Sequence, residues 1–260
     1  SEQEAIEISL DTLNHNISEV LSGESSAVID DMFRRGGSPG GARPKIYAGY
    51  NPRTNSLISG ISNLPEEYEH WIIKFAANAD SKDIANIELA YYKMALDAGI
   101  EMSDSKVFTS KTENSYFGTK RFDRIGNNKL HMLSAAGLLH DNYEHSTLDY
   151  GNLIFQAKKL TNNAKAAQQM FRRAVCNILS HNRDDHSKNF AFLMDADGIW
   201  SLAPAYDLTF SSSSQGYHST ACSGNYIDPG SKELLELANE LSISKAKTSI
   251  DEVKRIIDNW

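Results

Sequence analysis

The feature that most constrains this chain is a run of polar residues, HNRDDHSKN at 181–189, enclosed between two apolar segments. Before it, apolar residues recur in pairs at helical spacing from Ala166 to Asn182, which predicts a largely buried helix. After it, Phe190 to Met194 is apolar and predicts a strand. Removing so many polar groups from water beside a core costs free energy unless they bind a ligand or one another. The chemistry of this protein is therefore predicted to lie in this loop.

The composition indicates a soluble globular protein. The chain has 260 residues, of which 40% are hydrophobic and 23% charged, and no apolar run approaches the ~18–20 residues that span a bilayer. Its start, SEQEAIEISL, lacks the basic and apolar regions of a signal peptide. The two cysteines, Cys176 and Cys222, form neither a disulfide framework nor a CxxC pair. We therefore expect a cytoplasmic protein that does not contact the membrane.

The net charge of −8 argues against broad nucleic-acid binding, which requires neutralisation of phosphates. Two local basic clusters nevertheless stand out. One joins Arg34 and Arg35 with Arg43 and Lys45, and the other comprises Lys120, Arg121 and Arg124. Basic groups concentrated within an acidic chain favour a small polyanionic ligand such as a nucleotide, although any single basic residue is more typical of a solvated surface.

The first half of the chain is predicted to be rich in strands. A hairpin is expected at 46–59, with its turn at Asn51-Pro52, and a strand at 69–75. Ile87, Tyr91 and Met94 begin one apolar face of a helix that Gly99 is placed to end. Further strands are expected at 106–109 and 115–122.

The second half is predicted to be mainly helical. Beyond the helix at 166–182, a short hairpin is expected from strands at 190–194 and 200–202, followed by helices at 231–241 and 249–260. The last helix is predicted to open with Ser249 and Glu252 in capping-box spacing. The whole pattern predicts an α+β protein of two lobes. The N-lobe at 1–122 is expected to be rich in strands, and the C-lobe at 123–260 mainly helical.

Phosphoryl transfer uses the residue types of the polar loop. An aspartate accepts the proton of the substrate hydroxyl, a cation lies near the transferred phosphate, and an Asn carbonyl binds a magnesium ion. Asp184, Lys188 and Asn189 occur in this order, similar in logic to the D-x-x-x-x-N of protein kinases. Asp207, beyond the short hairpin, is the expected second acidic ligand. The loop therefore predicts a magnesium-dependent phosphotransferase.

His181 and His186 support a rival hypothesis. With Asp184 and Asp185 they resemble a hydrolytic metal site of imidazole and carboxylate ligands. Zinc motifs usually place two histidines one helical turn apart, however, and this spacing fits poorly. We therefore favour hydrogen-bonded structural histidines.

A kinase also needs a lysine on a strand to hold the nucleotide phosphates. Lys74 lies in the apolar segment WIIKF, where an unpaired ammonium is unfavourable, and Glu88 on the following helix is its expected partner. Upstream, SPGGARPK at 38–45 is rich in glycine, which allows backbone N–H groups to approach phosphates closely. Each signal is weak by itself, and it is their order along the chain that indicates a kinase.

In this order the motifs resemble those of the HipA-like serine/threonine kinases, the toxins of bacterial toxin–antitoxin modules. The similar segments are SPGGARPK (38–45), WIIKF (71–75), KRFDR (120–124), DDHSKNF (184–190) and PAYDL (204–208). The resemblance implies a two-lobed protein-kinase-like fold. Fewer than about 40 residues precede the glycine loop, which is too few for the additional N-terminal subdomain of full-length members, so the chain is expected to represent the kinase core.

The resemblance also implies roles for particular residues. Asp184 becomes the catalytic aspartate, with His186 and Lys188 lining the site, and its distance to Asn189 favours it over Asp185. The magnesium ligands become Asn189 and Asp207. The residues assigned to the ATP site are Lys74, Ser38, Gly40, Gly41, Ala42, Lys45, Glu88 and Arg121. Ser38 matches a loop serine whose autophosphorylation shuts such kinases down, because a phosphate there opposes the ATP phosphates.

The expected cofactors are ATP and Mg²⁺. By resemblance, the substrate is a protein such as a translation factor or an aminoacyl-tRNA synthetase, and the partner is a DNA-binding antitoxin of the HipB-like type. DNA is expected to associate through that partner and not with this acidic chain. Two alternatives stay open: a small-molecule kinase of the aminoglycoside or choline kinase type, and an inactive kinase fold that serves as a binding module.

Overall fold

The computed structural model describes residues 7–13, 15, 43–59, 62–78, 80–213 and 216–260. The chain divides into two compact units, each of which is described by itself. One comprises Ser1–Leu89 with Ser103–Lys129, and the other comprises Ala90–Met102 with Leu130–Trp260. The proposed lobe boundary at residues 122 and 123 lies a short way before the change of unit at residues 129 and 130.

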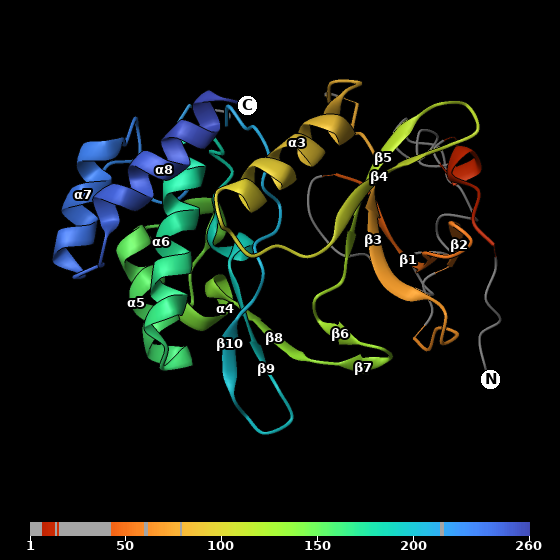
Figure 1. The fold of residues 1–260 in the computed structure, drawn as a ribbon, viewed down its shortest axis with the longest axis horizontal. Coiled ribbons are helices and arrows are strands. Elements are labelled where there is room, and N and C mark those ends of the chain that lie inside the picture. The colour runs from red at the N-terminus through yellow and green to blue at the C-terminus, as the bar shows by residue number, and fades with distance from the viewer. Residues whose placement is uncertain (1–6, 14, 16–42, 60–61, 79, 214–215) are drawn as a thin grey trace. The chain divides into compact units, whose positions relative to one another are not determined.

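A five-stranded antiparallel sheet forms the first unit (Figure 1). Its order is β2-β1-β3-β5-β4. The strands are β1 (Lys45–Asn51), β2 (Ser56–Ser59), β3 (Glu69–Lys74), β4 (Ser105–Thr109) and β5 (Ser115–Lys120). The first two confirm the predicted hairpin, and the other three confirm the predicted strands to within a few residues. A two-stranded hairpin of β6 (Arg124–Ile125) and β7 (Asn128–Lys129) follows β5.

Aromatic side chains fill one side of this sheet. Tyr50, Trp71 and Phe108 come from three different strands and meet edge to face, with ring centroids 5.0–5.6 Å apart. Gly118 in β5 makes this possible, because a Cβ at that position would lie 2.3 Å from Cε2 of Phe108. A side chain at 118 would therefore displace the phenyl ring that lies across the strand.

Helix α3 (Ile84–Asp97) confirms the helix that the apolar spacing predicts. It begins in the first unit and ends in the second, whereas the prediction placed it wholly in the N-lobe. Gly99 follows it with φ of +70°, a left-handed conformation that glycine adopts readily, and this confirms the predicted end of the helix. Ala95 and Ala98 have no exposed surface and belong to the core of the helical unit.

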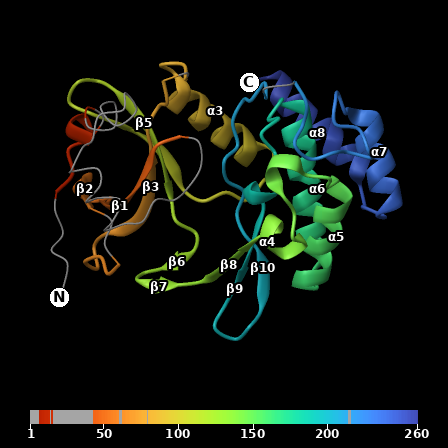
Figure 2. The ribbon, with the colours of Figure 1, turned by 180° about the vertical axis from the view of Figure 1, so that it is seen from behind.

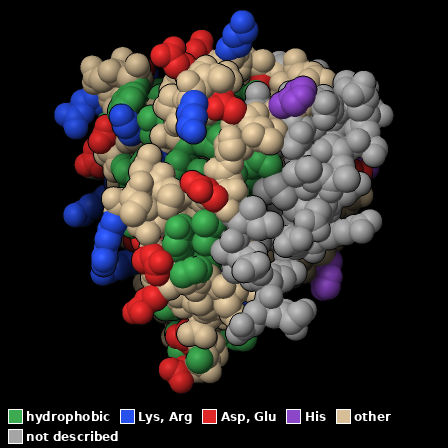
Figure 3. Space-filling view, turned by 90° about the vertical axis from the view of Figure 1, so that its right-hand side faces the viewer, with side chains coloured by type: hydrophobic (Ala, Val, Ile, Leu, Met, Phe, Trp, Pro, Cys, Tyr) green, Lys and Arg blue, Asp and Glu red, His purple; other side chains and the backbone are tan. Residues whose placement is uncertain are grey.

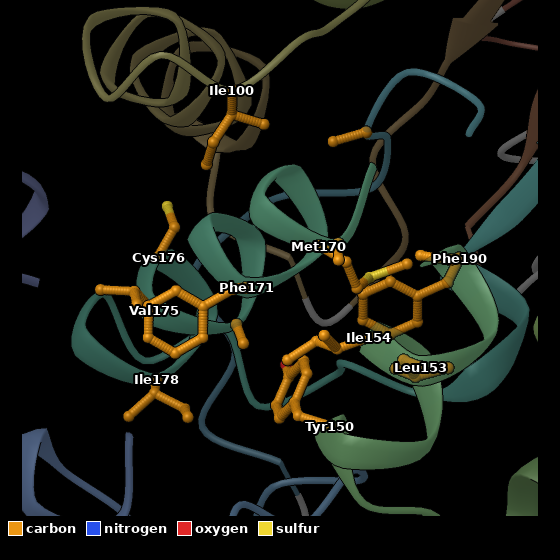
Figure 4. Packing of buried hydrophobic residues seen from close by; sticks show 14 of the residues in the cluster. Ile100, Tyr150, Leu153, Ile154, Met170, Phe171, Val175, Cys176, Ile178 and Phe190 are labelled. Atoms are coloured by element: carbon orange, nitrogen blue, oxygen red, sulfur yellow. The ribbon is translucent and has the colours of Figure 1, made fainter. Parts of the chain in front are cut away.

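The helical unit contains α4 (Ala135–Leu139), α5 (Tyr150–Thr161), α6 (Ala164–Leu179), α7 (Ser231–Glu240) and α8 (Ala246–Asp258). Helix α6 packs against α5 and α8 (Figure 2). Met170, Phe171 and Val175 of α6 point into the same apolar cluster as Leu153 and Ile154 of α5 (Figure 4). This confirms the predicted buried helix before the polar loop. A small sheet of order β10-β9-β8 contacts α5 through β10; its strands are β8 (His131–Ser134), β9 (Ala191–Met194) and β10 (Trp200–Leu202).

The predicted start of the last helix is wrong. Helix α8 begins at Ala246, after Lys245 in a left-handed conformation, so Ser249 and Glu252 lie inside it. Both side chains accept hydrogen bonds from Arg172 of α6, at 3.4 and 3.0 Å. The two residues therefore connect helices, whereas their spacing predicted a cap.

Candidate active site

Strand β3 and helix α3 bring Lys74 and Glu88 together. The Lys74 Nζ lies 2.6 Å from Oε2 of Glu88, and the Glu88 side chain is only 3% exposed. A buried carboxylate without a cation would be costly, so the burial itself favours the pair. The predicted pairing of these two residues is confirmed, and their contact with ATP remains a proposal.

Arg43 occupies the other oxygen of the same carboxylate. Its Nη1 lies 3.1 Å from Oε1 of Glu88, while its Nε and Nη2 bind both carboxylate oxygens of Asp80 at 2.9 and 3.0 Å. Sequence reasoning counted Arg43 only as one of several basic residues and overlooked Asp80. The available signal was an acidic residue placed just before a helix whose glutamate already required a cation.

Lys45 adds a third cation to this group. It lies directly opposite Lys74 in the register of β1 and β3, so both side chains leave the same face of the sheet. With Arg43, the two lysines make this part of the sheet rich in basic side chains, next to the carboxylates of Asp80 and Glu88. Ser38, Gly40, Gly41 and Ala42 of the predicted glycine loop lie outside the described residues.

The second basic cluster is largely neutralised by carboxylates. Arg121 binds both oxygens of Asp123 at 2.9 and 2.7 Å, and its guanidinium lies 4.2 Å from the centre of the Tyr47 ring. Arg124 also binds Asp123, at 2.6 Å, and Lys120 binds Glu69 at 2.7 Å. On the face shown in Figure 3, Lys and Arg side chains are likewise interspersed with Asp and Glu side chains outside the grey region. The cluster is therefore no open basic pocket, and a cofactor contact by Arg121 stays a proposal.

In the helical unit, the polar loop leaves the end of α6 and passes through the 3-10 turn η2 (Ser187–Asn189) into β9. Its two neighbouring aspartates have opposite environments. The side chain of Asp184 is 60% exposed, whereas that of Asp185 has no exposed surface. An exposed carboxylate can meet a substrate hydroxyl, and a buried one cannot.

Asp185 anchors the loop to the rest of the unit. Its carboxylate accepts hydrogen bonds from the Tyr150 hydroxyl at 2.6 Å and from the backbone N–H groups of Ser219 and Thr220 at 2.7 and 3.2 Å. His218 Nδ1 lies 2.9 Å from the same carboxylate. Burial, reinforced by the charge of Asp185, raises the pKa of Tyr150 well above its usual value, so this hydroxyl stays a donor. The sequence did not predict that Asp185 anchors the loop, because the partners of Asp185 are distant in the chain.

Asn189 is tied to the residue predicted to act as the base. Its Nδ2 donates to the backbone carbonyl of Asp184 at 2.8 Å. With the amide nitrogen engaged in this way, the amide oxygen is the atom suited to a metal ion. Carboxylate and amide oxygens are hard ligands, so the side-chain types of Asn189 and Asp207 suit Mg²⁺, and their role as its ligands stays a proposal.

Asp207 follows β10 and adopts a φ of +53°, a conformation that non-glycine residues seldom take and that is common at functional sites. The preceding Tyr206 donates its hydroxyl to the backbone carbonyl of Lys188 at 2.5 Å. This bond connects the residue before Asp207 to the residue before Asn189. Burial and the charge of Asp207 raise the pKa of Tyr206, which keeps the hydroxyl protonated.

The ring of Tyr143 contacts two side chains of the polar loop, those of Lys188 and His186. Lys188 Nζ lies 3.3 Å from the centre of the Tyr143 ring, and the His186 ring meets the same ring edge to face at 5.6 Å. Ser187 Oγ donates to Asp141 at 2.5 Å. The segment that contains Asp141 and Tyr143 therefore supports the loop, a function that sequence reasoning did not foresee.

The two histidines of the rival metal hypothesis differ in their surroundings. His181 is exposed, with φ of +56°, while His186 Nε2 lies 3.7 Å from a carboxylate oxygen of Asp184. Across the part of the chain that the structure describes, no group of three or more His, Cys, Asp and Glu side chains is placed to hold a metal ion. In the same part, none of the helices has the length and apolar character to cross a membrane.

A strand-rich unit with a buried lysine–glutamate pair and a helical unit with an aspartate–asparagine loop make up a two-lobed, protein-kinase-like α+β fold. Residues 37–260 match the HipA-like C-terminal domain, and the chain belongs to this family. The resemblance noted in the sequence is thereby confirmed.

Solved structures of similar fold were also found. The chain is similar to HipA of Shewanella oneidensis MR-1, solved in a complex with HipB and its operator DNA, with a TM-score of 0.74 at 18% sequence identity. The match covers 99% of this chain and 64% of that HipA chain, so this chain spans less than two thirds of that protein's length. A further similar structure is the Helicobacter pylori proinflammatory kinase CtkA, with a TM-score of 0.49, 16% identity, and coverage of 74% of this chain and 79% of that one. Among curated proteins, none matches this sequence.

Proposed function

We propose that the chain is an ATP- and magnesium-dependent serine/threonine protein kinase of the HipA-like toxin type. The observation that carries this proposal is the 2.6 Å ion pair between Lys74 on a strand and Glu88 on the following helix. Active protein kinases require such a pair, because it orients the lysine toward the nucleotide phosphates. Within a HipA-like fold, a buried pair of this kind favours catalysis over a purely structural role.

The proposed mechanism transfers the γ-phosphoryl group of ATP to a protein hydroxyl. Asp184 orients the hydroxyl and accepts its proton as the new phosphorus–oxygen bond forms and the bond to ADP breaks. Lys188 supplies positive charge near the transferred group, and His186 lines the site beside Asp184. Asn189 and Asp207 would hold the magnesium ion, which neutralises charge on the phosphates when bound.

In the other unit, Lys74 contacts the ATP phosphates and Glu88 orients it. Lys45 and Arg121, together with Ser38, Gly40, Gly41 and Ala42, complete the proposed nucleotide site. Autophosphorylation of Ser38 would place a charge near −2 beside the ATP phosphates and inhibit the enzyme. Mass spectrometry of the active protein incubated with ATP tests this, and an unmodified Ser38 contradicts it.

The proposed partners follow from the family. HipA of Shewanella was solved with HipB and operator DNA, and we propose a HipB-like antitoxin as the partner of this chain in the cytoplasm. The proposed substrate is a protein hydroxyl, in a translation factor or an aminoacyl-tRNA synthetase.

Calorimetry tests the nucleotide site. We expect Mg·ATP to bind, and Lys74→Met to weaken the affinity by about tenfold or more, as for the loss of a buried charge contact. Lys111→Met is the matched control, because Lys111 is exposed in the same unit. This variant should bind Mg·ATP with unchanged affinity. An unsubstituted protein that does not bind Mg·ATP contradicts the proposal.

Labelled ATP distinguishes the classes of function. We expect label to appear on a protein of a bacterial lysate with the unsubstituted chain and with the control Asp197→Asn, an exposed aspartate of the β9–β10 turn, but not with Asp184→Asn. Label on small molecules alone would favour the aminoglycoside or choline kinase type. Binding of ATP without any transfer would indicate a binding module.

A further inference from the structure

The Lys74–Glu88 pair is part of a larger ion network. Glu88 uses one carboxylate oxygen for Lys74 at 2.6 Å and the other for Arg43 at 3.1 Å. Because this carboxylate is 3% exposed, water does little to stabilise its charge, and its direction is set by the two cations that it meets. Lys74 therefore shares its partner with a residue outside the strand–helix pair.

Arg43 is itself fixed in place by Asp80. Two parallel N–H···O bonds of 2.9 and 3.0 Å join the guanidinium to this carboxylate, which also accepts the backbone N–H of Ala77 at 2.8 Å. Such a fork restricts the guanidinium in two dimensions, which a single bond does not. Arg43 lies two residues before the first residue of β1, so this network joins the segment that leads into β1 to the turn before α3 and to α3 itself.

From this geometry we infer that Arg43, held by Asp80, is a positioning residue that directs the Glu88 carboxylate toward Lys74. The inference rests on the proposed function, because it assigns to Arg43 an effect on ATP binding that acts through Lys74. Removing the guanidinium removes the fork on Asp80, and Glu88 loses the contact that fixes its second oxygen. Lysine cannot replace arginine here, because one ammonium cannot bind Asp80 through a fork and also reach Glu88.

Steady-state kinetics with Mg·ATP tests the inference. We expect Arg43→Gln, Arg43→Lys and Asp80→Asn each to raise KM for ATP about tenfold, with kcat changed by less than about threefold. The combination of Arg43→Gln with Asp80→Asn should raise KM little further, because both residues act through one network. Arg53→Gln is the control, since Arg53 is exposed in the β1–β2 turn of the same unit.

Positioning is separated from folding by the two constants together with the folded fraction of each variant. An irreversibly misfolded fraction lowers the apparent kcat and leaves KM unchanged, whereas reversible partial unfolding raises KM by the reciprocal of the folded fraction. Each variant is therefore assayed under conditions in which denaturant unfolding shows it to be folded. Unchanged KM in the Arg43 and Asp80 variants of an active kinase therefore overturns the inference and leaves the proposed function standing. If the unsubstituted protein neither binds nor turns over ATP, the proposed function fails, and the inference fails with it.

Discussion

At the scale of single residues, two adjacent aspartates of the polar loop have different environments and different proposed roles. Asp184 and Asp185 are adjacent, yet one side chain is 60% exposed and the other fully buried among four hydrogen-bond partners. From the sequence we predict a catalytic aspartate and, through the spacing to Asn189, choose Asp184 for this role. It does not reveal that Asp185 is buried, because Tyr150 and His218 lie more than thirty residues away on either side.

Substitution of Asp185 should therefore affect stability. Asp185→Asn places an amide donor among groups that donate, and we expect it to lower the free energy of unfolding by about 3 kcal/mol. Asp184→Asn, at an exposed position, should change it by no more than about 0.5 kcal/mol. Denaturant unfolding of both variants measures the difference, and equal effects would contradict the anchoring role of Asp185.

If the proposed function holds, Tyr143 should affect the rate of phosphoryl transfer through Lys188. Tyr143→Leu removes the ring face on which the ammonium lies, and we expect kcat to fall about tenfold, as for the loss of a cation–π contact of about 1–2 kcal/mol. Tyr143→Phe keeps the ring face and should stay within about twofold of the unsubstituted protein. If the two variants have the same kcat, the ring does not position Lys188.

His70 should make part of the stability depend on pH. Burial, the largest effect, together with Arg124 and Arg121, lowers the pKa of His70 despite its hydrogen bond to Asn127. Below the pKa of the unfolded residue, about 6.5, the unfolded state then binds more protons than the folded state. This contribution to stability is complete above about pH 6.5 and is lost as the pH falls through the folded pKa. The free energy of unfolding between about pH 7 and 5 should decline less steeply in His70→Gln, and parallel slopes would contradict the assignment.

At the scale of helices and strands, the sequence predicted most of what the structure contains. Periodicity found α3, α6 and the five strands of the large sheet, because each buries one face against a single core. It did not predict α5, whose first turn carries Gly151 and Asn152, both poor helix formers. That helix is stabilised by burial of Leu153 and Ile154 and by an Asp149–Asn152 capping box, a pairing less recognisable than Ser with Glu.

Gly118 illustrates a constraint that periodicity does not detect. A Cβ there would lie 2.3 Å from Phe108, so we expect Gly118→Ala to lower the free energy of unfolding by about 2 kcal/mol. In a Phe108→Leu background, which removes the atoms that the new Cβ would meet, Gly118→Ala should lower the free energy of unfolding by clearly less. Chemical denaturation of the four proteins in this cycle measures the coupling. Additive effects would contradict the role of Gly118 in accommodating the ring.

At the scale of the whole molecule, the proposed function uses residues of both units. Lys74 and Glu88 belong to the strand-rich unit, and Asp184, Asn189 and Asp207 belong to the helical unit. The order of these residues in the chain could be recognised from the sequence, since each motif is short and local. The Arg43–Asp80 fork and the Tyr206–Lys188 bond could not, because each joins segments whose contact arises only from the fold.

The most direct measurement of the central claim is the rate of phosphoryl transfer from Mg·ATP by Asp184→Asn, at the same folded fraction as the unsubstituted protein. Loss of the group that accepts the hydroxyl proton should lower this rate by about a thousandfold, while ATP affinity and thermal stability stay close to those of the unsubstituted chain. A variant that transfers phosphate within a few-fold of the unsubstituted rate would contradict the account. So would an unsubstituted protein that binds Mg·ATP and transfers no phosphate.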